Sequence, residues 1–122
     1  MQKKTLKTLM VAGLAAAALF LMGTGSGAVI TGAQAKELVQ KQHAFLLDVR
    51  TPEEFSSGHV DGATNIPVQV LEAQLGSLPA KKDQDVVVYC HSGRRSAMAK
   101  AMLEKAGYTK VHDLGAMTNW NK

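Results

Sequence analysis

Apolar runs alternate along most of this chain with segments in which apolar residues recur at every third or fourth position. Two of the runs are almost continuous, AFLLDV at 44–49 and VVVYC at 86–90. Runs of this length are typical of strands that are covered on both faces. Shorter strands are predicted at 28–30 (AVI), 63–67 (ATNIP) and 111–114 (VHDL).

Helices are predicted between these strands, from the helical spacing of apolar positions. The predicted helices cover residues 31–42, 51–57, 68–78 and 96–107. The second has the clearest start, because Thr51 fits the N-cap, Pro52 the first helical position and Glu54 the closing position of a capping box. Ser96 is the expected N-cap of the last helix, and Gly107 is the residue expected to end it.

The order of these elements predicts an α/β fold. Strands that alternate with helices imply a central, mainly parallel sheet with helices on both faces, which is a three-layer α/β/α arrangement. The chain has 122 residues and no internal repeat, so we expect a single domain at 29–122.

Residues 1–28 have the pattern of a secretory signal peptide. Three lysines near the N-terminus precede an apolar run at 9–22, and small residues follow it. The run is shorter than the roughly 20 residues with which a helix crosses a bilayer, so an uncleaved membrane anchor is the less favoured alternative. We expect cleavage after Ala28, because the other small-x-small site, which ends at Ala35, would cut into the first predicted helix.

Export changes how the net charge is interpreted. The formal charge of +4 includes those three lysines and is +1 without them, so it does not indicate binding to nucleic acid. From the signal peptide we expect an exported protein, periplasmic or otherwise, that meets the membrane only during export. We also expect it to be a monomer. Cys90 is the only cysteine, so the chain cannot form an internal disulfide.

The single cysteine lies where α/β sheets bind their ligands. Cys90 ends the second apolar strand, and such ligand sites lie beyond the carboxyl ends of the strands. The loop after it contains Gly93, Arg94 and Arg95 and leads into a helix N-terminus, where N–H groups and the helix dipole favour an anion. A thiol in this setting is expected to be ionised at neutral pH and to act as a nucleophile. The less favoured alternative is an inert core cysteine.

Other candidate side chains carry weaker signals. Asp48 and Arg50 end the first apolar strand, so a parallel sheet would bring them to the same edge as Cys90. His91 follows the thiol directly, but a loop histidine in this place is more often incidental. The three remaining histidines have no metal-ligand spacing, so we predict neither a metal nor another cofactor.

Several short motifs follow one another in a characteristic order. They are DVR at 48–50, PEEF at 52–55, GHVDGA at 58–63, NIP at 65–67, YCHSGRRS at 89–96 and AGY at 106–108, followed by Val111. In order and spacing they resemble the rhodanese family of sulfurtransferases, from about Val29 to Trp120. Together with the export signal, the chain is similar to the exported single-domain thiosulfate sulfurtransferases of that family.

The resemblance implies a rhodanese-like fold and a sulfur-transfer mechanism. Cys90 would take the outer sulfur of a donor such as thiosulfate as a persulfide and pass it to cyanide or a thiol. One of the two loop arginines would bind the sulfonate of the donor. Asp48 and Arg50 would support the loop structurally. The N–H groups that would surround the bound sulfur belong to His91, Ser92, Gly93, Arg94, Arg95 and Ser96.

Three other functions stay open at this point. Cysteine phosphatases also hold a thiolate among N–H donors, but they place five residues between cysteine and arginine, where this chain has three before Arg94 and four before Arg95. A persulfide carrier for one protein partner is the second alternative. A non-catalytic binding module is the third, although such modules usually lack the cysteine.

One position departs from the family pattern. The family usually has a second glycine where this chain has Ala116, after Gly115. If that position requires a positive φ, we expect the alanine to strain the turn.

Overall fold

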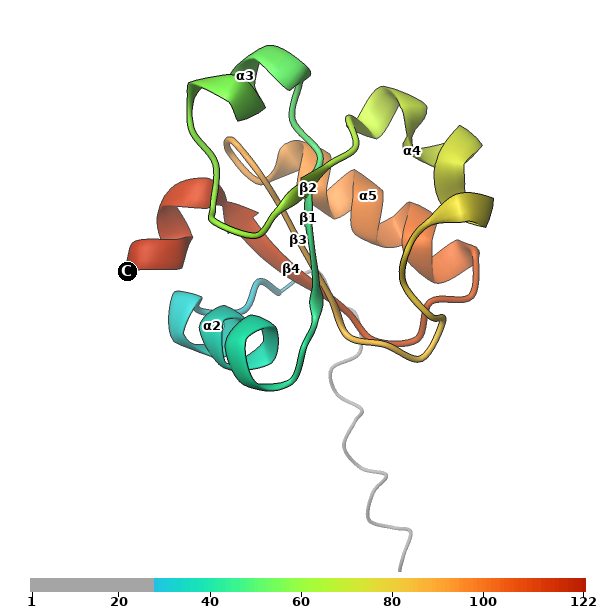
Figure 1. Ribbon diagram of the computed structural model, residues 1–122, viewed down its shortest axis with the longest axis horizontal. Coiled ribbons are helices and arrows are strands. Elements are labelled where there is room, and N and C mark those ends of the chain that lie inside the picture. Colours follow the sequence, from blue (N-terminus) through green and yellow to red (C-terminus); the bar gives the residue numbers. More distant parts are fainter. Residues whose placement is uncertain (1–27) are drawn as a thin grey trace, which may run out of the picture.

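The computed structural model describes residues 28–122, so the predicted signal peptide lies, except for its last residue, outside the described residues. Four parallel strands form one sheet in the order β2-β1-β3-β4 (Figure 1). They are β1 (Phe45–Asp48), β2 (Thr64–Asn65), β3 (Val86–Cys90) and β4 (Val111–Ala116). The parallel sheet predicted from the alternation of strands and helices is confirmed.

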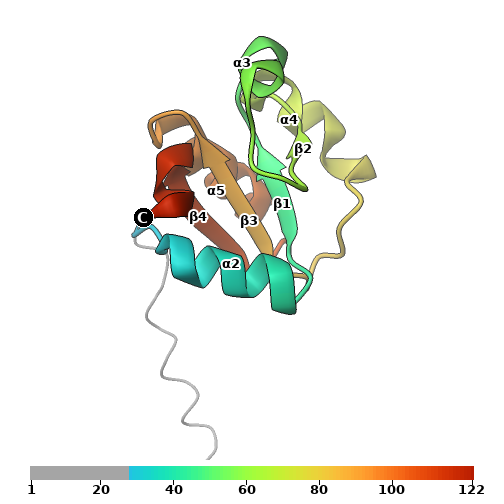
Figure 2. The same ribbon diagram turned by 60° about the vertical axis from the view of Figure 1, so that its left-hand side comes forward.

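Helices cover both faces of this sheet, which confirms the three-layer arrangement (Figure 2). They are α2 (Gly32–Lys41), α3 (Pro52–Ser57), α4 (Val68–Gln74), α5 (Arg94–Lys105) and two 3-10 helices, η2 (Leu75–Ser77) and η3 (Met117–Asn121). α2 and η3 pack on one face, and α4 and α5 pack on the other. α3 lies beyond the end of β1 (Figure 1). Within residues 28–122, no helix has both the length and the apolar character needed to cross a membrane.

The central strand β3 explains why the sequence contains a fully apolar run. All of its residues are buried. Val86, Val88 and Cys90 belong to the core layer of α4 and α5, whereas Val87 and Tyr89 belong to the layer of α2. Because helices cover both faces, no position of this strand is left for a solvated side chain.

A capping box sets the start of α2, which falls within the range predicted for the first helix, residues 31–42. The Thr31 hydroxyl accepts a hydrogen bond from the Gln34 N–H (3.0 Å), and the Gln34 side chain accepts one from the Thr31 N–H (2.9 Å). The helix then buries Ala35 completely against the sheet. The Thr31 cap and the burial of Ala35 in the first turn therefore both contribute to holding α2 on the sheet.

The short strand predicted at 28–30 is not formed. The Ile30 N–H donates to the Asp113 carbonyl of β4 (2.8 Å), the one backbone hydrogen bond that joins this segment to β4 within the described residues. The chain turns into α2 directly after Ile30, so it leaves the edge of the sheet before a ladder of hydrogen bonds can form.

The start of α5 also differs from the prediction. The helix begins at Arg94, and Gly93 rather than Ser96 is its N-cap, with a φ of 107°. This left-handed backbone turns the chain from strand to helix early, and it favours glycine because a Cβ would be strained there. Ser96 lies buried in the first turn, where its hydroxyl donates to the Gly93 carbonyl (3.1 Å).

The predicted end of α5 is confirmed. Gly107 has a φ of 104°, and the Tyr108 N–H bonds back to the Leu103 carbonyl at 3.0 Å. This is the hydrogen bond by which a left-handed glycine commonly closes a helix.

The left-handed position near the end of β4 falls on Gly115, one residue before Ala116. Gly115 has a φ of 81°, whereas Ala116 has φ −75° and ψ 142°, a conformation that any residue adopts. The strain expected at Ala116 is therefore not found. Gly115 also lies close to the loop that follows Cys90, since a Cβ on Gly93 would be 3.8 Å from the Gly115 Cα.

The contacts around α2 predict the effect of a truncation. A chain that starts at Lys36 would lose the Thr31 cap, the Ile30 hydrogen bond and the buried Ala35. Relative to a chain that starts at Val29, we expect its free energy of unfolding to be lower by about 2 kcal/mol or more, from the lost cap and the lost apolar burial. Urea unfolding of the two purified chains measures the difference. Equal midpoints would show that the first turn of α2 contributes nothing to stability.

Candidate active site

Cys90 is buried beneath the loop that follows it. The thiol is free, its exposed fraction is 0 %, and its Sγ accepts a hydrogen bond from the Gly93 N–H at 2.9 Å. The structure confirms that the thiol lies at the carboxyl end of a strand. The sulfur is closed off from solvent, however, so a reagent reaches it only when neighbouring groups move.

The first turn of α5, which follows Gly93 directly, contains further N–H donors. The first i→i−4 hydrogen bond of the helix runs from the Ala97 N–H to the Gly93 carbonyl (3.2 Å), so the N–H groups of Arg94, Arg95 and Ser96 have no partner within the helix. No side chain caps this end. Unpaired N–H groups and the helix dipole together favour an anion at this end of α5.

The two loop arginines have different surroundings. The Arg95 guanidinium pairs with Glu54 of α3, from Nη1 to Oε1 at 2.8 Å and from Nη2 to Oε2 at 3.1 Å. This contact raises the pKa of Arg95. Arg94 is exposed, and no carboxylate pairs with it in the part of the chain that the structure describes. Of the two positive charges, only that of Arg94 is uncompensated. The exposed residues His91 and Ser92 complete the loop.

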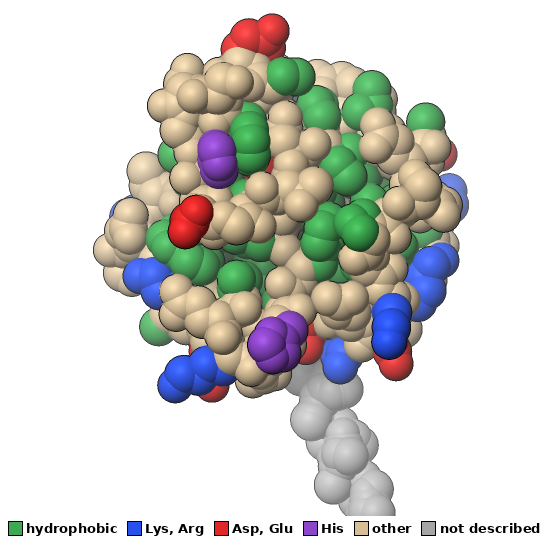
Figure 3. Space-filling view, viewed as in Figure 1, with side chains coloured by type: hydrophobic (Ala, Val, Ile, Leu, Met, Phe, Trp, Pro, Cys, Tyr) green, Lys and Arg blue, Asp and Glu red, His purple; other side chains and the backbone are tan. Residues whose placement is uncertain are grey.

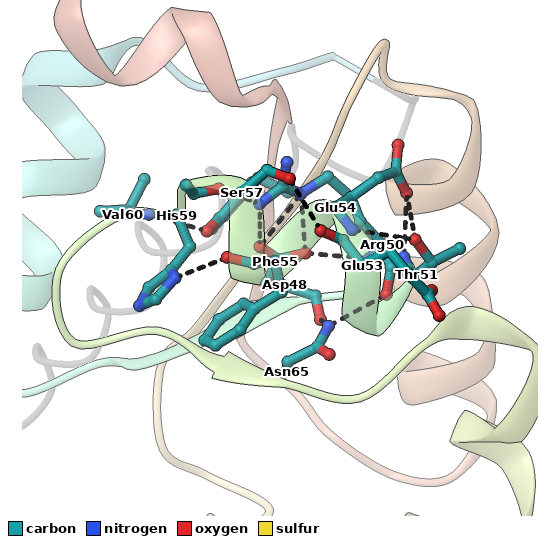
Figure 4. Close-up of polar contacts among 12 residues, drawn as sticks. Asp48, Arg50, Thr51, Glu53, Glu54, Phe55, Ser57, His59, Val60 and Asn65 are labelled. Carbon is teal, nitrogen blue, oxygen red and sulfur yellow. Dashed lines mark hydrogen bonds and ion pairs between the residues drawn. The ribbon is translucent and has the colours of Figure 1, made fainter.

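Glu54 is the residue that sequence reasoning missed. Its carboxylate closes the predicted capping box of α3, accepting from the Thr51 N–H (2.9 Å) and hydroxyl (3.2 Å), as the labelled residues in Figure 4 show. The same carboxylate also accepts both hydrogen bonds from Arg95. These bonds, with those from Thr51, lower the pKa of Glu54 to about 2. The capping motif accounts for the glutamate locally, and no local signal indicates its second partner, which lies 41 positions away in the sequence.

Asp48 and Arg50 form a buried ion pair beside the site. Arg50 is 4 % exposed and Asp48 is 0 % exposed, and the Arg50 Nη2 lies 2.7 Å from the Asp48 Oδ2. This pairing raises the pKa of Arg50. The same Nη2 donates to the Gly58 carbonyl at 2.8 Å, which ties the chain after α3 to the end of β1. Both side chains are thus engaged in contacts within the fold, and their role as structural support of the loop stays a prediction.

Two further side chains tie the same segment down. The Val60 N–H donates to the buried Tyr89 hydroxyl (3.0 Å), and burial raises the pKa of Tyr89. The Asn65 side chain donates to the carbonyls of Asp48 and Arg50, each at 3.0 Å (Figure 4). The segment from α3 to β2 is therefore held from below by polar contacts.

The rest of the described surface offers less chemistry. On the face drawn in Figure 3, basic and acidic side chains are interspersed along the lower rim, and apolar side chains gather over α4. An open cavity of about 420 Å³ lies beside α2, with Ile30, Leu38 and His112 in its lining, and it does not include Cys90. Residues 28–122 contain no cluster of three or more histidine, cysteine or acidic side chains placed to hold a metal.

A family model for the rhodanese-like domain matches residues 31–122. The chain is 39 % identical to thiosulfate sulfurtransferase PspE of Escherichia coli (strain K12) over 71 residues, which are 58 % of this chain and 68 % of that protein. It is 36 % identical to a sulfurtransferase of Allochromatium vinosum over 86 residues, 70 % of this chain and 78 % of the relative. The solved structure of the human single-domain sulfurtransferase TSTD1 has a TM-score of 0.69 and 29 % identity, covering 76 % of this chain and 94 % of that one. A rhodanese with anions from E. coli has a TM-score of 0.59 and 37 % identity, covering 62 % and 89 %.

The buried pair predicts a large loss of stability when one partner is removed. Asp48→Ala would leave the Arg50 charge buried without its carboxylate. Because an uncompensated buried charge is strongly unfavourable, we expect the free energy of unfolding to fall by about 3–5 kcal/mol. Urea denaturation measures this. The control is Glu37→Ala, which removes a partner from the exposed pair with Lys41 (3.8 Å), and there we expect a loss below about 1 kcal/mol. Similar losses for both variants would contradict the prediction.

The Glu54 pKa predicts an acid-sensitive contribution to stability. Its value of about 2 in the folded protein lies below the ordinary 4.5, so the stabilisation is present above about pH 4.5 and is lost as the pH falls toward 2. Over this range we expect wild type to lose about 1 kcal/mol more than Glu54→Gln, since the pair is partly exposed and screened. Urea midpoints at steps from pH 5 to 2 test this. Parallel pH profiles of the two proteins would rule out the contribution.

Proposed function

The chain belongs to the rhodanese-like domain family, and we propose that it is a thiosulfate sulfurtransferase that works through a persulfide on Cys90. Its sulfurtransferase relatives support the general class of reaction. The single observation that carries the finer proposal is the setting of the Cys90 sulfur. Sγ accepts the Gly93 N–H at 2.9 Å and lies at the uncapped N-terminus of α5.

In the first step the Cys90 thiolate attacks the outer sulfur of thiosulfate. A bond forms between Sγ and that sulfur, and the sulfur–sulfur bond of the donor breaks, so that sulfite leaves with the electron pair. Cys90 then carries a persulfide, whose terminal sulfur is anionic. The loop N–H groups stabilise the charge that develops on the transferred sulfur, because they are already in place when the reaction starts.

In the second step the persulfide gives its terminal sulfur to an acceptor. Cyanide attacks that sulfur, the bond to Sγ breaks with its electron pair returning to Cys90, and thiocyanate leaves. A thiolate acceptor reacts in the same way and becomes a persulfide itself. Neither step needs a cofactor, because the electron pairs balance between donor, Cys90 and acceptor.

Arg94 is the side chain that we assign to the sulfonate of the donor. The choice between the two arginines left open by the sequence falls on Arg94 because its charge is exposed and uncompensated, whereas Arg95 is paired with Glu54. A planar guanidinium can meet two oxygens of a sulfonate at once.

The alternatives differ in the acceptor or in the size of the loop. A persulfide carrier for a protein partner would share the first step and differ only in the second. A phosphatase would need a larger anion site, and the loop places Arg94 and Arg95 closer to Cys90 in sequence than the phosphatase pattern does. Export by the predicted signal peptide, as a monomer without a nucleic-acid partner, is part of the same proposal.

Loading with sulfur tests the proposal directly. We expect incubation with thiosulfate to add the mass of one sulfur atom to the protein, and cyanide to remove it with release of thiocyanate. Cys90→Ser should abolish both steps, because a serine hydroxyl without a neighbouring base is a weak nucleophile. Intact-mass spectrometry measures the loading, and circular dichroism checks that the variant is folded.

Two outcomes would overturn the proposal. One is a Cys90→Ser protein that still transfers sulfur, and the other is a wild-type protein that never gains the extra atom. A parallel assay with p-nitrophenyl phosphate tests the phosphatase alternative, for which we expect no turnover that depends on Cys90. Loading from thiosulfate without transfer to cyanide or small thiols would favour the carrier.

A further inference from the structure

We propose, on the basis of the function proposed above, that Glu54 is a positioning residue for sulfur transfer. Through Arg95 it holds the loop over Cys90 in the conformation that receives the sulfur. Glu54 lies outside the loop, on α3, and its carboxylate bonds to Thr51 and Arg95 rather than to the thiol. Its effect on the reaction would therefore pass entirely through Arg95.

Polar contacts, rather than apolar packing, hold α3 in place. The helix has no buried residue, so the hydrophobic effect contributes little to its position. At its far end the Gly58 carbonyl accepts from Arg50 (2.8 Å). At its near end Glu54 accepts two hydrogen bonds from Arg95 (2.8 and 3.1 Å). Among the described residues, the contact between Glu54 and Arg95 is the one side-chain hydrogen-bonded contact that joins α3 to the loop and helix start after Cys90.

The two-pronged geometry of this link makes it suited to positioning. A bidentate contact between a guanidinium and a carboxylate fixes the orientation of both groups, not only their distance. Arg95 lies in the first turn of α5, two residues after Gly93, whose N–H contacts Sγ. Holding Arg95 therefore holds the turn that carries the N–H donors.

The pairing also separates the roles of the two arginines. Glu54 compensates the charge of Arg95, and Arg94 keeps an uncompensated charge at the surface. Arg94 would contact the donor both before and during the reaction, so its loss should weaken binding. Glu54 and Arg95 would align N–H donors on charge that develops only during transfer, so their loss should slow the chemical step.

Glu54→Gln is a clean test variant, because it keeps the cap of α3. A glutamine closes the same kind of capping box in α2, where the Gln34 side chain accepts the Thr31 N–H at 2.9 Å. The variant thus removes the charged pairing with Arg95 and leaves the helix start intact. Arg95→Lys is the complementary variant, since it keeps the charge and loses the two-pronged contact. The matched control is Glu53→Gln, which removes an exposed carboxylate one position earlier on α3.

Single-turnover loading of Cys90 from thiosulfate separates rate from binding. For Glu54→Gln we expect the saturating loading rate to fall by about tenfold or more, with the half-saturating thiosulfate concentration within about twofold of wild type. Arg95→Lys should behave in the same way, and the double variant should lose no more than either single one. Arg94→Ala should instead raise the half-saturating concentration by about tenfold. Glu53→Gln should match wild type.

A second measurement does not depend on sulfur transfer. Iodoacetamide alkylates the thiol at a limiting rate that is read on the high-pH plateau, where all of it is ionised. Because Cys90 is 0 % exposed, release of the loop should raise this limiting rate several-fold in Glu54→Gln and Arg95→Lys, and not in Glu53→Gln.

The two measurements distinguish failure of this inference from failure of the proposed function. If wild type takes no sulfur from thiosulfate, the function is wrong and the alkylation rates alone decide whether Glu54 holds the loop. If wild type loads but Glu54→Gln loads and alkylates at wild-type rates, the positioning role is overturned. Wild-type behaviour of Arg95→Lys beside a slow Glu54→Gln would also overturn it, since charge alone would then suffice.

Discussion

The carboxylate of Asp48 and the guanidinium of Arg50 lie buried together at the end of β1, joined by side-chain hydrogen bonds of 2.7 to 3.1 Å. Charges taken out of water must stay paired, so neither group can move without leaving the other uncompensated. Arg50 carries this constraint to the Gly58 carbonyl, and Asn65 carries it to β2 by binding the backbone of both residues. This pair therefore anchors the segment after α3, which the Tyr89 hydroxyl also holds through the Val60 N–H.

Cys90 and its cover, which is the loop after it together with α3, are held by different forces. Cys90 ends a strand that is buried on both faces, so close packing sets the position of its sulfur. The loop and α3 have little apolar anchorage, and ion pairs and hydrogen bonds hold them. The sulfur is held by packing, and the groups above it are held by hydrogen bonds and ion pairs. This arrangement fits the proposed reaction, in which a small anion must enter and leave a closed site. Polar ties can break and reform at the surface, where water replaces them at small net cost.

Local signals made much of the fold predictable. The apolar run of β3, the capping box at Thr51 and the end of α5 at Gly107 each depend on residues within one or two turns of chain. The errors arose where a local signal competed with a distant contact. Ser96 resembled an N-cap, but the left-handed backbone of Gly93 starts α5 earlier. The positive φ near the end of β4 falls on Gly115, and neighbouring residues alone do not decide which of the two positions, 115 or 116, takes it.

The sequence by itself determined the alternation of strands and helices, the placement of Cys90 at a strand end and the family that its motifs resemble, because periodicity, capping and motif order are encoded by residues close together in the chain. Only the tertiary structure decided that Arg95 pairs with Glu54, a partner 41 positions away, and that Arg94 is left with the free charge. The burial of the thiol was decided in the same way. An ion pair or a covered sulfur depends on which segments meet in space, and for residues this far apart their meeting follows from the packing of the whole sheet and its helices.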